Sequence, residues 1–532
     1  MNPLKKLTDN YLFLALLAGV LLWLSWPPFQ TAPLLFISFF PLFLLQDKIQ
    51  EEGRKRKVFW IYAYIAMITW NILTTWWLWY ASKPGLFLAV FLNSAMMTLP
   101  WLAFDLTRKR YGNKLGYPAF IVYWLAFEYW HLNWQVSWPW LTLGNAFSTF
   151  TNWVQWYEYT GFLGGSLWVL IINVLVFKIT VDYNRTRIFY LAGLVVVPII
   201  ASYLILNKIL DDNSGQPVTV SIIQPNIDPY TDKFGGMTPQ EQVDSMMVLA
   251  ERSMTPATRL VVFPETAVLG DTYGMDEGQL ENYPAIVQLR DFCRRHKVNI
   301  LTGADTYYFY KQDEKRSATA RKYQNQDIYY DSYNTALLVD SNTALQVYHK
   351  SKLVPGVEIL PYPQIFRPIE KLFDLGGTSG ALGIQDDAEV FITADSLKLA
   401  PIICYESIYG DWVGSYVRQG ANLLCIITND GWWRNTPGYR QHLLYAKLRA
   451  IETRRNIVRS GNTGISAFIS HKGEIEERTE WWVPVYLNNS TYLKTEMTWY
   501  TQNGDFIGKL AAWLAGFVLL SAIVKSVVKK GY

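Results

Sequence analysis

The feature that most constrains this chain is a series of apolar runs, nearly all of them in its first 210 residues. A helix that crosses a bilayer needs roughly 17 to 25 predominantly apolar residues. Runs that reach or approach that length are 11–27, 32–46, 58–80, 85–106, 117–132, 159–181, 187–208 and 508–525. The first run is followed by Pro-Pro-Phe and lacks a small-x-small cleavage site, so we interpret it as a retained helix and not as a signal peptide. The sequence therefore predicts a polytopic α-helical membrane domain of about eight spans.

The apolar runs divide the chain into regions of different composition. Over the whole sequence 51% of the residues are hydrophobic and 17% are charged, but residues 217–505 have the composition of an ordinary soluble domain. The predicted regions are a seven-span transmembrane domain at 1–210, a soluble domain at 217–505, a C-terminal transmembrane helix at 508–525 and a basic cytoplasmic tail at 526–532.

Lysine and arginine residues gather in every second loop between the apolar runs. The basic positions are Lys5, Lys6, Arg54–Lys57, Arg108–Arg110, Lys114, Arg185, Arg187, Lys525, Lys529 and Lys530. Basic loops of membrane proteins stay in the cytoplasm. We therefore expect a multi-pass protein of the cytoplasmic (inner) membrane with both termini in the cytoplasm. The soluble domain would then lie on the extracytoplasmic, periplasmic side.

The composition argues against several other classes of function. The net charge of +4 is small, and topology explains where most of the basic residues lie, so we expect no nucleic acid partner. The three cysteines, Cys293, Cys404 and Cys425, form neither a C-x-x-C motif nor a disulfide framework. The five histidines are scattered without the spacing of metal ligands. We expect neither a metal ion nor another cofactor.

The soluble region alternates strand-like and helix-like segments. Apolar, β-branched runs predict strands at 218–227, 259–268, 299–305, 333–340, 345–350, 397–406 and 421–430. Amphipathic patterns predict helices at 281–298 and 439–456, and residues 311–327 are polar and without periodicity, which indicates a surface loop. Strands that alternate with helices are typical of an α/β domain with buried sheets.

Three of the predicted strands end in a residue that can take part in catalysis. Glu265, Lys350 and Cys404 follow the runs VVFP, VYH and PII, and side chains at strand ends converge on clefts. A cysteine reacts as the thiolate, whereas a free thiol with a pKa of about 8.5 is mostly protonated at neutral pH. Glu265 could take the thiol proton, and Lys350 could stabilise the thiolate and then the oxyanion of a tetrahedral intermediate. No histidine has a convincing position to replace Glu265.

A series of short motifs resembles those of one protein family. FPET at 263–266, YHKSKL at 348–353 and CYE at 404–406 resemble the Glu-Lys-Cys motifs of the nitrilase, or carbon-nitrogen hydrolase, superfamily. The resemblance is closer to a membrane branch of that superfamily, the apolipoprotein N-acyltransferases, and covers essentially the whole chain. The further motifs are WPWLxLGN (138–145), QPN (224–226), LVPxxE (353–358), TND (428–430), SGNTG (460–464) and YTxxGD (500–505).

The resemblance implies a fold and a role for individual residues. The soluble region would be an extracytoplasmic, nitrilase-like αββα sandwich. Cys404 would be the acyl-accepting nucleophile, Glu265 the general base and Lys350 the residue that stabilises the oxyanion. The supporting residues would be the carboxylates Glu358 and Glu406 and, beside the nucleophile, Tyr405.

The family's reaction moves a fatty acyl chain from a phospholipid, through a cysteine thioester, to the α-amino group of the diacylglyceryl-cysteine at a lipoprotein N-terminus. The resemblance therefore implies a ping-pong acyltransferase with a phospholipid donor, a diacylated apolipoprotein acceptor and a place in the bilayer. We expect a monomer. Two rival interpretations stay open: a membrane-tethered nitrilase-type amidase or hydrolase, in which water takes the acyl group, and a non-enzymatic membrane scaffold.

Several of the polar residues also have a purely structural interpretation. Cys293 and Cys425 are expected to be buried and structural, as free cysteines usually are. Asn429–Asp430 either close a strand as a turn or contribute to the site. Ion pairs with neighbouring lysines or arginines would explain Glu358 and Glu406 as well as a supporting role does.

Two longer segments receive a structural interpretation. The tryptophans of the loop at 131–158 are interpreted as residues of the interfacial aromatic belt; they are Trp138, Trp140, Trp153 and Trp156. The helix predicted at 439–456 is expected to pack against the sheet and to carry an arginine-rich solvated face.

Overall fold

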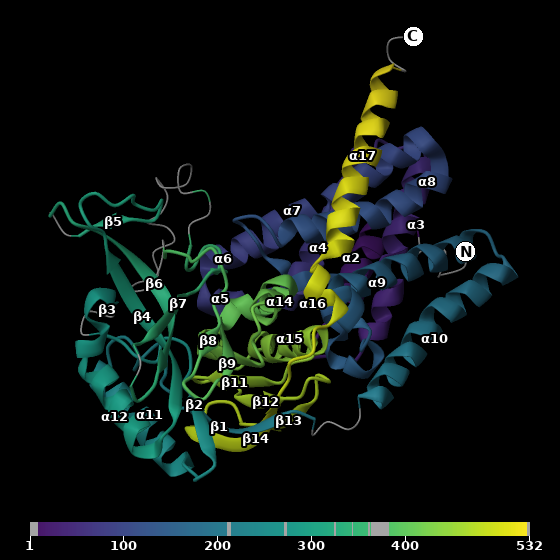
Figure 1. Ribbon diagram of the computed structural model, residues 1–532. Helices are drawn as coiled ribbons and strands as arrows, with labels where there is room; N and C mark the ends of the chain where they lie inside the picture. The colour runs from purple at the N-terminus through teal and green to yellow at the C-terminus, as the bar shows by residue number, and fades with distance from the viewer. Residues whose placement is uncertain are drawn as a thin grey trace. The chain divides into compact units, whose positions relative to one another are not determined.

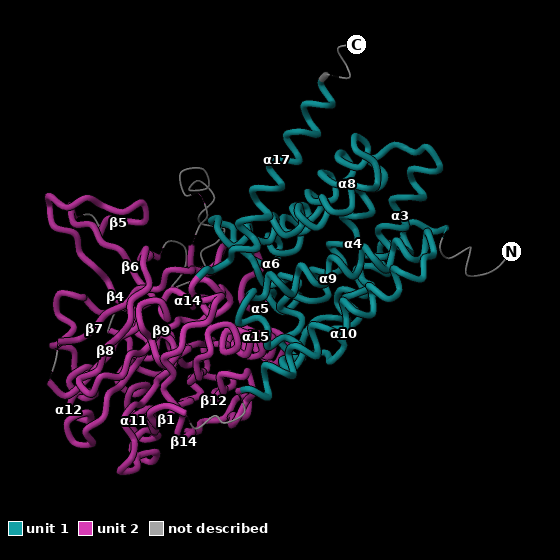
Figure 2. The backbone as a smooth tube through the Cα atoms, turned by 45° about the vertical axis from the view of Figure 1, so that its right-hand side comes forward, with its two compact units in different colours: residues 1–79, 85–208, 503–532 teal, residues 80–84, 209–502 magenta. Residues whose placement is uncertain are grey.

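The computed structural model describes residues 9–209, 214–270, 274–323, 326–342, 344–359, 362 and 382–528 (Figure 1). The chain forms two compact units (Figure 2): unit 1 comprises residues 1–79, 85–208 and 503–532, and unit 2 comprises residues 80–84 and 209–502. The described residues do not include four lysines that were used to predict the orientation, Lys5, Lys6, Lys529 and Lys530. They also do not include residues 529–532 of the predicted tail.

Unit 1 is built from helices. The longer ones are α2 (Tyr11–Leu24), α3 (Phe40–Glu51), α4 (Lys57–Thr75), α8 (Leu99–His131), α9 (Tyr157–Val181), α10 (Arg185–Lys208) and α17 (Phe506–Val528). Six helical stretches of the described chain are long and apolar enough to cross a membrane: Ala32–Glu51, Lys57–Thr75, Lys83–His131, Tyr157–Val181, Arg185–Lys208 and Phe506–Val527. Helix α2 is apolar but has only 14 residues.

The predicted spans at 85–106 and 117–132 lie in one continuous helical stretch, Lys83–His131. That stretch is interrupted at Gly112, whose φ of 70° and ψ of −172° are not helical. Glycine adopts such a backbone readily because it has no Cβ. The break falls inside the predicted basic loop, so the stretch provides two helices. The number of membrane crossings and their direction stay predictions.

Helices α10 and α17 carry large apolar side chains on their surfaces. Phe189, Trp513 and Phe517 are 76%, 81% and 76% exposed. A soluble protein rarely leaves extended apolar surface in contact with water, whereas hydrocarbon is a suitable environment for it. These helices are therefore suited to contact lipid.

Irregular backbone inside unit 1 is satisfied by polar side chains. Between η1 (Ala32–Ile37) and α3 the α-helical hydrogen-bond pattern is interrupted, and Asn173 of α9 compensates for it. Its Oδ1 accepts a hydrogen bond from the amide of Phe39 at 2.9 Å, and its Nδ2 donates to the carbonyl of Leu35 at 2.8 Å. Backbone groups without water must find such partners, which explains a fully buried asparagine in an apolar helix.

The prediction that Trp138 and Trp140 belong to an interfacial belt is wrong. Trp140 is fully buried and Trp138 is nearly so, and their rings stack with centroids 5.4 Å apart. Trp77 packs on Trp140 with a centroid separation of 5.0 Å. The two indoles are therefore part of the core of unit 1. Tryptophan is suited both to the membrane interface and to a protein core, so the sequence alone could not distinguish these two environments.

Unit 2 contains two β-sheets. The first has the order β14-β1-β2-β4-β6-β5, with β3 paired to β4 and β7 to β6, and the second has the order β13-β12-β11-β10-β9-β8. The first sheet consists of β1 (Gln216–Gln224), β2 (Thr258–Val262), β3 (Met275–Asp276), β4 (Asn299–Phe309), β5 (Arg321–Lys322), β6 (Tyr329–Val339), β7 (Gln346–His349) and β14 (Val485–Leu493). The second consists of β8 (Phe391–Ile392), β9 (Lys398–Ile403), β10 (Leu423–Thr428), β11 (Ile457–Gly461), β12 (Ala467–Ile469) and β13 (Ile475–Arg478). All seven predicted strands are confirmed, with shifted ends.

The two sheets pack face to face and helices cover their outer faces, which confirms the αββα sandwich (Figure 1). Successive residues of a strand point to opposite faces. In β2, Leu260 and Val262 face the second sheet, whereas Val261 points into the core formed with α11 and α12. The outer helices are α11 (Pro239–Ser253), α12 (Pro284–His296), α14 (Gly410–Arg418) and α15 (Pro437–Thr453).

Strands β9, β10 and β11 run parallel in the centre of the second sheet. Ile403 pairs with Ile427, and Thr428 pairs with Gly461. The carboxyl ends of the three strands are therefore level. Residues that follow these ends share one edge of the sheet, which is where α/β proteins commonly place their sites.

Candidate active site

The three residues predicted at strand ends lie where the sequence placed them. Lys350 directly follows β7, Cys404 directly follows β9 and begins the short helix η8 (Cys404–Ile408), and Glu265 follows β2 after two intervening residues. Their exposed fractions are 1%, 8% and 6%. Burial of three chemically active groups costs free energy unless they are paired, so their partners decide what they can do.

Lys350 is held between two carboxylates. Its Nζ lies 3.0 Å from Oε1 of Glu265 and 2.7 Å from Oε1 of Glu358. Asn334 joins the same group, because its Nδ2 donates to Oε1 of Glu265 at 2.8 Å and of Glu358 at 3.2 Å. Burial alone would lower the pKa of Lys350, but the two carboxylates raise it well above its usual value. The lysine is therefore a permanent cation at neutral pH.

Cys404 occupies strained backbone beside this charged group. Its φ is +47°, in the left-handed region that residues with a Cβ rarely occupy. Burial raises the pKa of its thiol well above the usual value; Glu265 raises it further and Lys350 lowers it. The charges of both residues therefore act on the sulfur, and the resting thiol is protonated at neutral pH.

A protonated thiol, a buried carboxylate and a fixed cation form a set that suits acyl transfer through a covalent intermediate. Two family models match the chain in agreement with this chemistry. Residues 18–175 match the apolipoprotein N-acyltransferase N-terminal domain, and residues 219–486, slightly more than half of the chain, match carbon-nitrogen hydrolase.

The chain belongs to the carbon-nitrogen hydrolase family, in its apolipoprotein N-acyltransferase branch.

Relatives of this N-acyltransferase family align over almost the whole chain. A protein named apolipoprotein N-acyltransferase from Chlorobaculum tepidum is 29% identical over 98% of this chain and 98% of its own. Proteins of the same name from Geobacter metallireducens and Rickettsia prowazekii are 26% and 25% identical, over 96% and 93% of this chain and 94% of each of theirs. With its apolar helices, this member of the family is a multi-pass membrane protein.

In this member of the N-acyltransferase family, the carboxylate of Glu406 contacts two backbone amides and the hydroxyl of a tyrosine. Its carboxylate accepts hydrogen bonds from the amide of Ile403 at 2.8 Å, the amide of Ser351 at 2.7 Å and the hydroxyl of Tyr348 at 2.6 Å. It thereby ties the end of β9 to the residue that follows Lys350. The ring of Tyr405 is buried and packs edge-on against Tyr409 at 5.5 Å.

The motifs SGNTG and TND contribute a series of hydrogen bonds that ends at the carboxylate of Glu265. Asn462 of SGNTG bonds the amide and carbonyl of Ile227 at 3.0 and 2.8 Å, and its Nδ2 donates to Oδ1 of Asn429 at 3.2 Å. The amide of Asn429 in turn donates to Oε2 of Glu265 at 3.0 Å. Asn429 therefore contributes through its backbone, which the sequence left open.

The sequence did not single out Lys233, which also lies at the site. Its buried Nζ contacts the carbonyl oxygen of Glu265 at 3.3 Å and the hydroxyl of Thr266. Burial lowers the pKa of Lys233 to about 8, although Asp305 and Glu265 oppose that change. The residue lies in an irregular segment between β1 and α11, where no periodicity marks it.

The prediction of an arginine-rich solvated face on the helix at 439–456 is wrong. Arg449, Arg454 and Arg455 are all at least nine-tenths buried, and Arg440 is exposed. Nε of Arg449 lies 2.7 Å from Oε2 of the equally buried Glu452, so the charge is paired. A buried guanidinium is stable when carboxylates and carbonyls accept its hydrogen bonds. Some of these acceptors come from distant parts of the chain, such as the carbonyl of Ile408 for Arg449 and that of Ala421 for Arg455. Cys293 and Cys425 are buried, as predicted.

Proposed function

We propose that this chain is an apolipoprotein N-acyltransferase: it moves a fatty acyl chain from a membrane phospholipid to the α-amino group of a diacylated lipoprotein. The observation that carries the proposal is that one chain joins the N-acyltransferase membrane domain to a hydrolase-type domain. The group around Lys350 and Cys404 supports it, because a hydrolase-type site must also form a covalent acyl intermediate before it can transfer the acyl group.

In the first half-reaction, the sulfur of Cys404 attacks the carbonyl carbon of the phospholipid ester while Glu265 takes the thiol proton. The raised pKa of the thiol requires that a base act at the moment of attack. Lys350 stabilises the negative charge on the carbonyl oxygen. The C–O bond then breaks, the departing lysophospholipid takes the proton from Glu265, and Cys404 is left as a thioester.

In the second half-reaction, the unprotonated α-amino group of the lipoprotein attacks the thioester carbonyl. The amine gives up a proton to Glu265, the C–S bond breaks, and the proton returns to the sulfur of Cys404. The acyl group has then moved from oxygen to nitrogen without consumption of water. Glu358 supports Lys350 through its 2.7 Å ion pair, and Glu406 and Tyr405 support the backbone of the nucleophile.

The acyl donor explains why the chemistry is joined to apolar helices. Exposing hydrocarbon to water costs about 0.8 kcal/mol per CH₂, so extracting a long acyl chain completely would cost about 10 kcal/mol or more. We therefore infer that the enzyme acts at the surface of the cytoplasmic membrane. The loops rich in lysine and arginine favour an extracytoplasmic unit 2 and cytoplasmic termini.

The test uses the full-length protein in vesicles whose phospholipid carries an isotope-labelled acyl chain. Mass spectrometry should find the label on the peptide that contains Cys404, and addition of a diacylated lipopeptide should move it to the peptide's terminal amine. Cys404→Ala is the control and should carry no label. Release of labelled fatty acid, with no transfer to the lipopeptide, would instead identify a membrane-tethered hydrolase.

A further inference from the structure

The carbonyl group of Cys404 is held by two side chains. Ser407 Oγ donates to it at 2.7 Å, and His442 Nε2 lies 3.1 Å from it. The same Nε2 lies 2.9 Å from Ser407 Oγ. Because the φ of Cys404 is +47°, this peptide adopts a backbone that persists only where surrounding contacts over-determine it. The two side chains provide contacts of this kind, in addition to the backbone bonds of η8.

The surroundings of His442 fix which ring nitrogen carries a proton. The carbonyl of Cys404 is an acceptor, and Ser407 already uses its proton on that carbonyl, so Nε2 must be the donor. The other nitrogen, Nδ1, lies 3.0 Å from Oδ1 of Asp430 and 3.1 Å from a guanidinium nitrogen of Arg459. In the neutral tautomer with hydrogen on Nε2, and in the imidazolium, this hydrogen is directed at the carbonyl of Cys404.

Asp430 anchors the imidazole from behind. It follows β10, whereas His442 lies on α15 and Arg459 on β11, and all three side chains are fully buried. Asp430 accepts from Arg459 at 2.6 Å and from Thr428 at 2.7 Å, besides its contact with the imidazole. Residues from β11, from α15 and from the end of β10 thus form one chain of contacts that ends at the carbonyl of Cys404.

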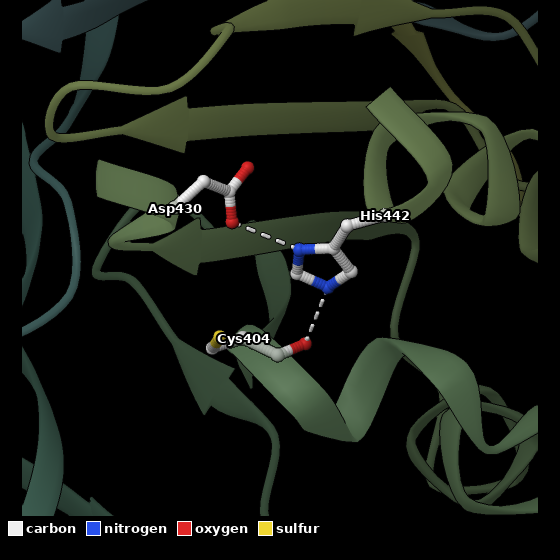
Figure 3. A group of neighbouring side chains, drawn as sticks. All are labelled: Cys404, Asp430 and His442. Carbon is white, nitrogen blue, oxygen red and sulfur yellow. Dashed lines mark hydrogen bonds and ion pairs between the residues drawn. The ribbon is translucent and has the colours of Figure 1, made fainter. Parts of the chain in front are cut away.

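An aspartate and a histidine beside a cysteine have the composition of a protease triad, but the geometry differs. In a triad the imidazole contacts the reacting atom and removes its proton. Figure 3 shows the sulfur of Cys404 on the far side of the residue from the imidazole, while the carbonyl oxygen points at Nε2. His442 therefore acts on the backbone of Cys404, and the thiol is left to Glu265.

The same three residues could also be read as metal ligands, because one atom of each lies within 4.8 Å of the others. Their existing partners argue against that reading. The oxygens of Asp430 are bonded to Arg459 and Thr428, and the guanidinium lies within hydrogen-bonding distance of Nδ1 of His442. A metal ion bound there would lie against a buried positive charge, which is unfavourable in a medium of low dielectric constant.

We propose that His442, anchored by Asp430, is a positioning residue that fixes the peptide after Cys404 and so aims the thiol. The inference rests on the proposed function for its reaction, but thiol reactivity can be measured without any lipid. A displacement of a reacting group by about 1 Å can cost about 100-fold in rate, so loss of the anchor should be visible in the reactivity of Cys404.

Two amide variants of the full-length protein distinguish the contact made by Nε2 of His442 from the contact made by Nδ1. In His442→Gln the amide nitrogen reaches the position of Nε2 and can still donate to Cys404. In His442→Asn it reaches only the position of Nδ1 and keeps the contact with Asp430. We expect His442→Asn to slow alkylation of Cys404 by iodoacetamide by about 100-fold. His442→Gln should react about tenfold faster than His442→Asn, the factor that one hydrogen bond of ordinary strength contributes.

Mass spectrometry of the Cys404 peptide measures the rates, and thermal unfolding of each variant shows whether it is folded. His471→Gln, at another buried histidine of unit 2, is the matched control and should alkylate at the wild-type rate. In phospholipid turnover, the kcat of His442→Asn should fall while KM stays near that of the wild type. Equal alkylation rates for the wild type and a folded His442→Asn, or equal rates for the two amide variants, would overturn the proposal.

A second variant covers the case in which the asparagine variant does not fold. Ser407→Ala removes a single buried oxygen, so it disturbs packing little, and it deletes the other donor to the Cys404 carbonyl. We expect alkylation to slow by about tenfold; an unchanged rate would show that this carbonyl does not control the thiol. If the alkylation results hold and no phospholipid acylates the protein, the proposed function fails while the positioning role stands.

Discussion

The Nζ atom of Lys350 lies 3.0 Å from Oε1 of Glu265, and both side chains are buried. Charges shielded from water interact strongly, and removal of one partner leaves the other buried without compensation. The proposed base and the proposed oxyanion stabiliser are therefore also structural partners. Substitutions of either residue must preserve shape, and unfolding must be measured beside activity.

Substitution of the proposed nucleophile should abolish acyl transfer. Cys404→Ala should lose at least about 10³-fold in rate, because removal of a covalent nucleophile has effects of this order or larger. Cys293→Ala and Cys425→Ala should keep most of the activity, since both thiols are buried in apolar cores, and the charges of Glu265 and Lys350 are not among the influences on either pKa. Transfer of labelled acyl chains to a diacylated lipopeptide is the measurement. Substantial activity in Cys404→Ala would contradict the thioester mechanism.

Glu265→Gln should leave a folded protein that forms the thioester slowly. The amide has the shape of the carboxylate, and its single oxygen can still accept from either Asn429 or Asn334, but it cannot take the thiol proton. The loss of general base catalysis should cost about 10²–10⁴-fold. Single-turnover acylation from labelled phospholipid, followed by mass spectrometry, gives this rate. Acylation at the wild-type rate would mean that another group is the base.

The reactivity of Cys404 should keep rising with pH above neutrality. Burial, reinforced by Glu265, raises the pKa of the thiol well above its usual value. The thiolate fraction, and with it alkylation by iodoacetamide, should therefore increase about tenfold per pH unit until that raised pKa is reached. A short cysteine peptide is the control and should level off near its ordinary pKa. A plateau for Cys404 below pH 7 would mean instead that Lys350 holds a preformed thiolate.

The sidedness predicted by the basic loops can be tested with reporters that work only outside the cytoplasm. A reporter inserted at 313–325 should be active, because this loop is polar and unit 2 is predicted to be extracytoplasmic. The same reporter inserted at 54–57 should be inactive. The opposite pattern would overturn the topology and the lipoprotein acceptor that depends on it.

Residues at strand ends could be predicted because a strand end is visible in the sequence. The apolar run before Cys404 and the β-branched run before Glu265 mark where each chain segment leaves its sheet, and the structure confirms those places. The sequence could predict that Lys350 pairs with carboxylates, but it could not predict which carboxylate oxygens lie near Nζ. Glu358 and Glu406 were predicted only from the family resemblance. Their separations in sequence from the residues that they contact follow no helical or strand periodicity, so no pattern indicated them.

His442 and Lys233 could not be predicted in the same way. His442 is 38 residues from Cys404, and they meet because α15 returns over strands whose register is fixed by pairing. The arginines of this segment made the helix resemble a solvated one, whereas Arg449 pairs with the buried Glu452, and Arg454 and Arg455 donate to buried carbonyls. One signal in the sequence could have indicated this group. Asp430 follows β10 and Cys404 follows β9, and because these two strands are parallel neighbours, their ends lie side by side.

The left-handed backbone at Cys404 sets stability against activity in any engineering of this protein. A residue with a Cβ costs about 1–2 kcal/mol more than glycine in this conformation, while the extra chain entropy of glycine returns about 0.5–1 kcal/mol. Glycine at position 404 would therefore relieve the backbone strain and remove the proposed nucleophile. Selection for thermostability alone would drift toward that inert protein, so a directed-evolution screen must demand acyl transfer in every round.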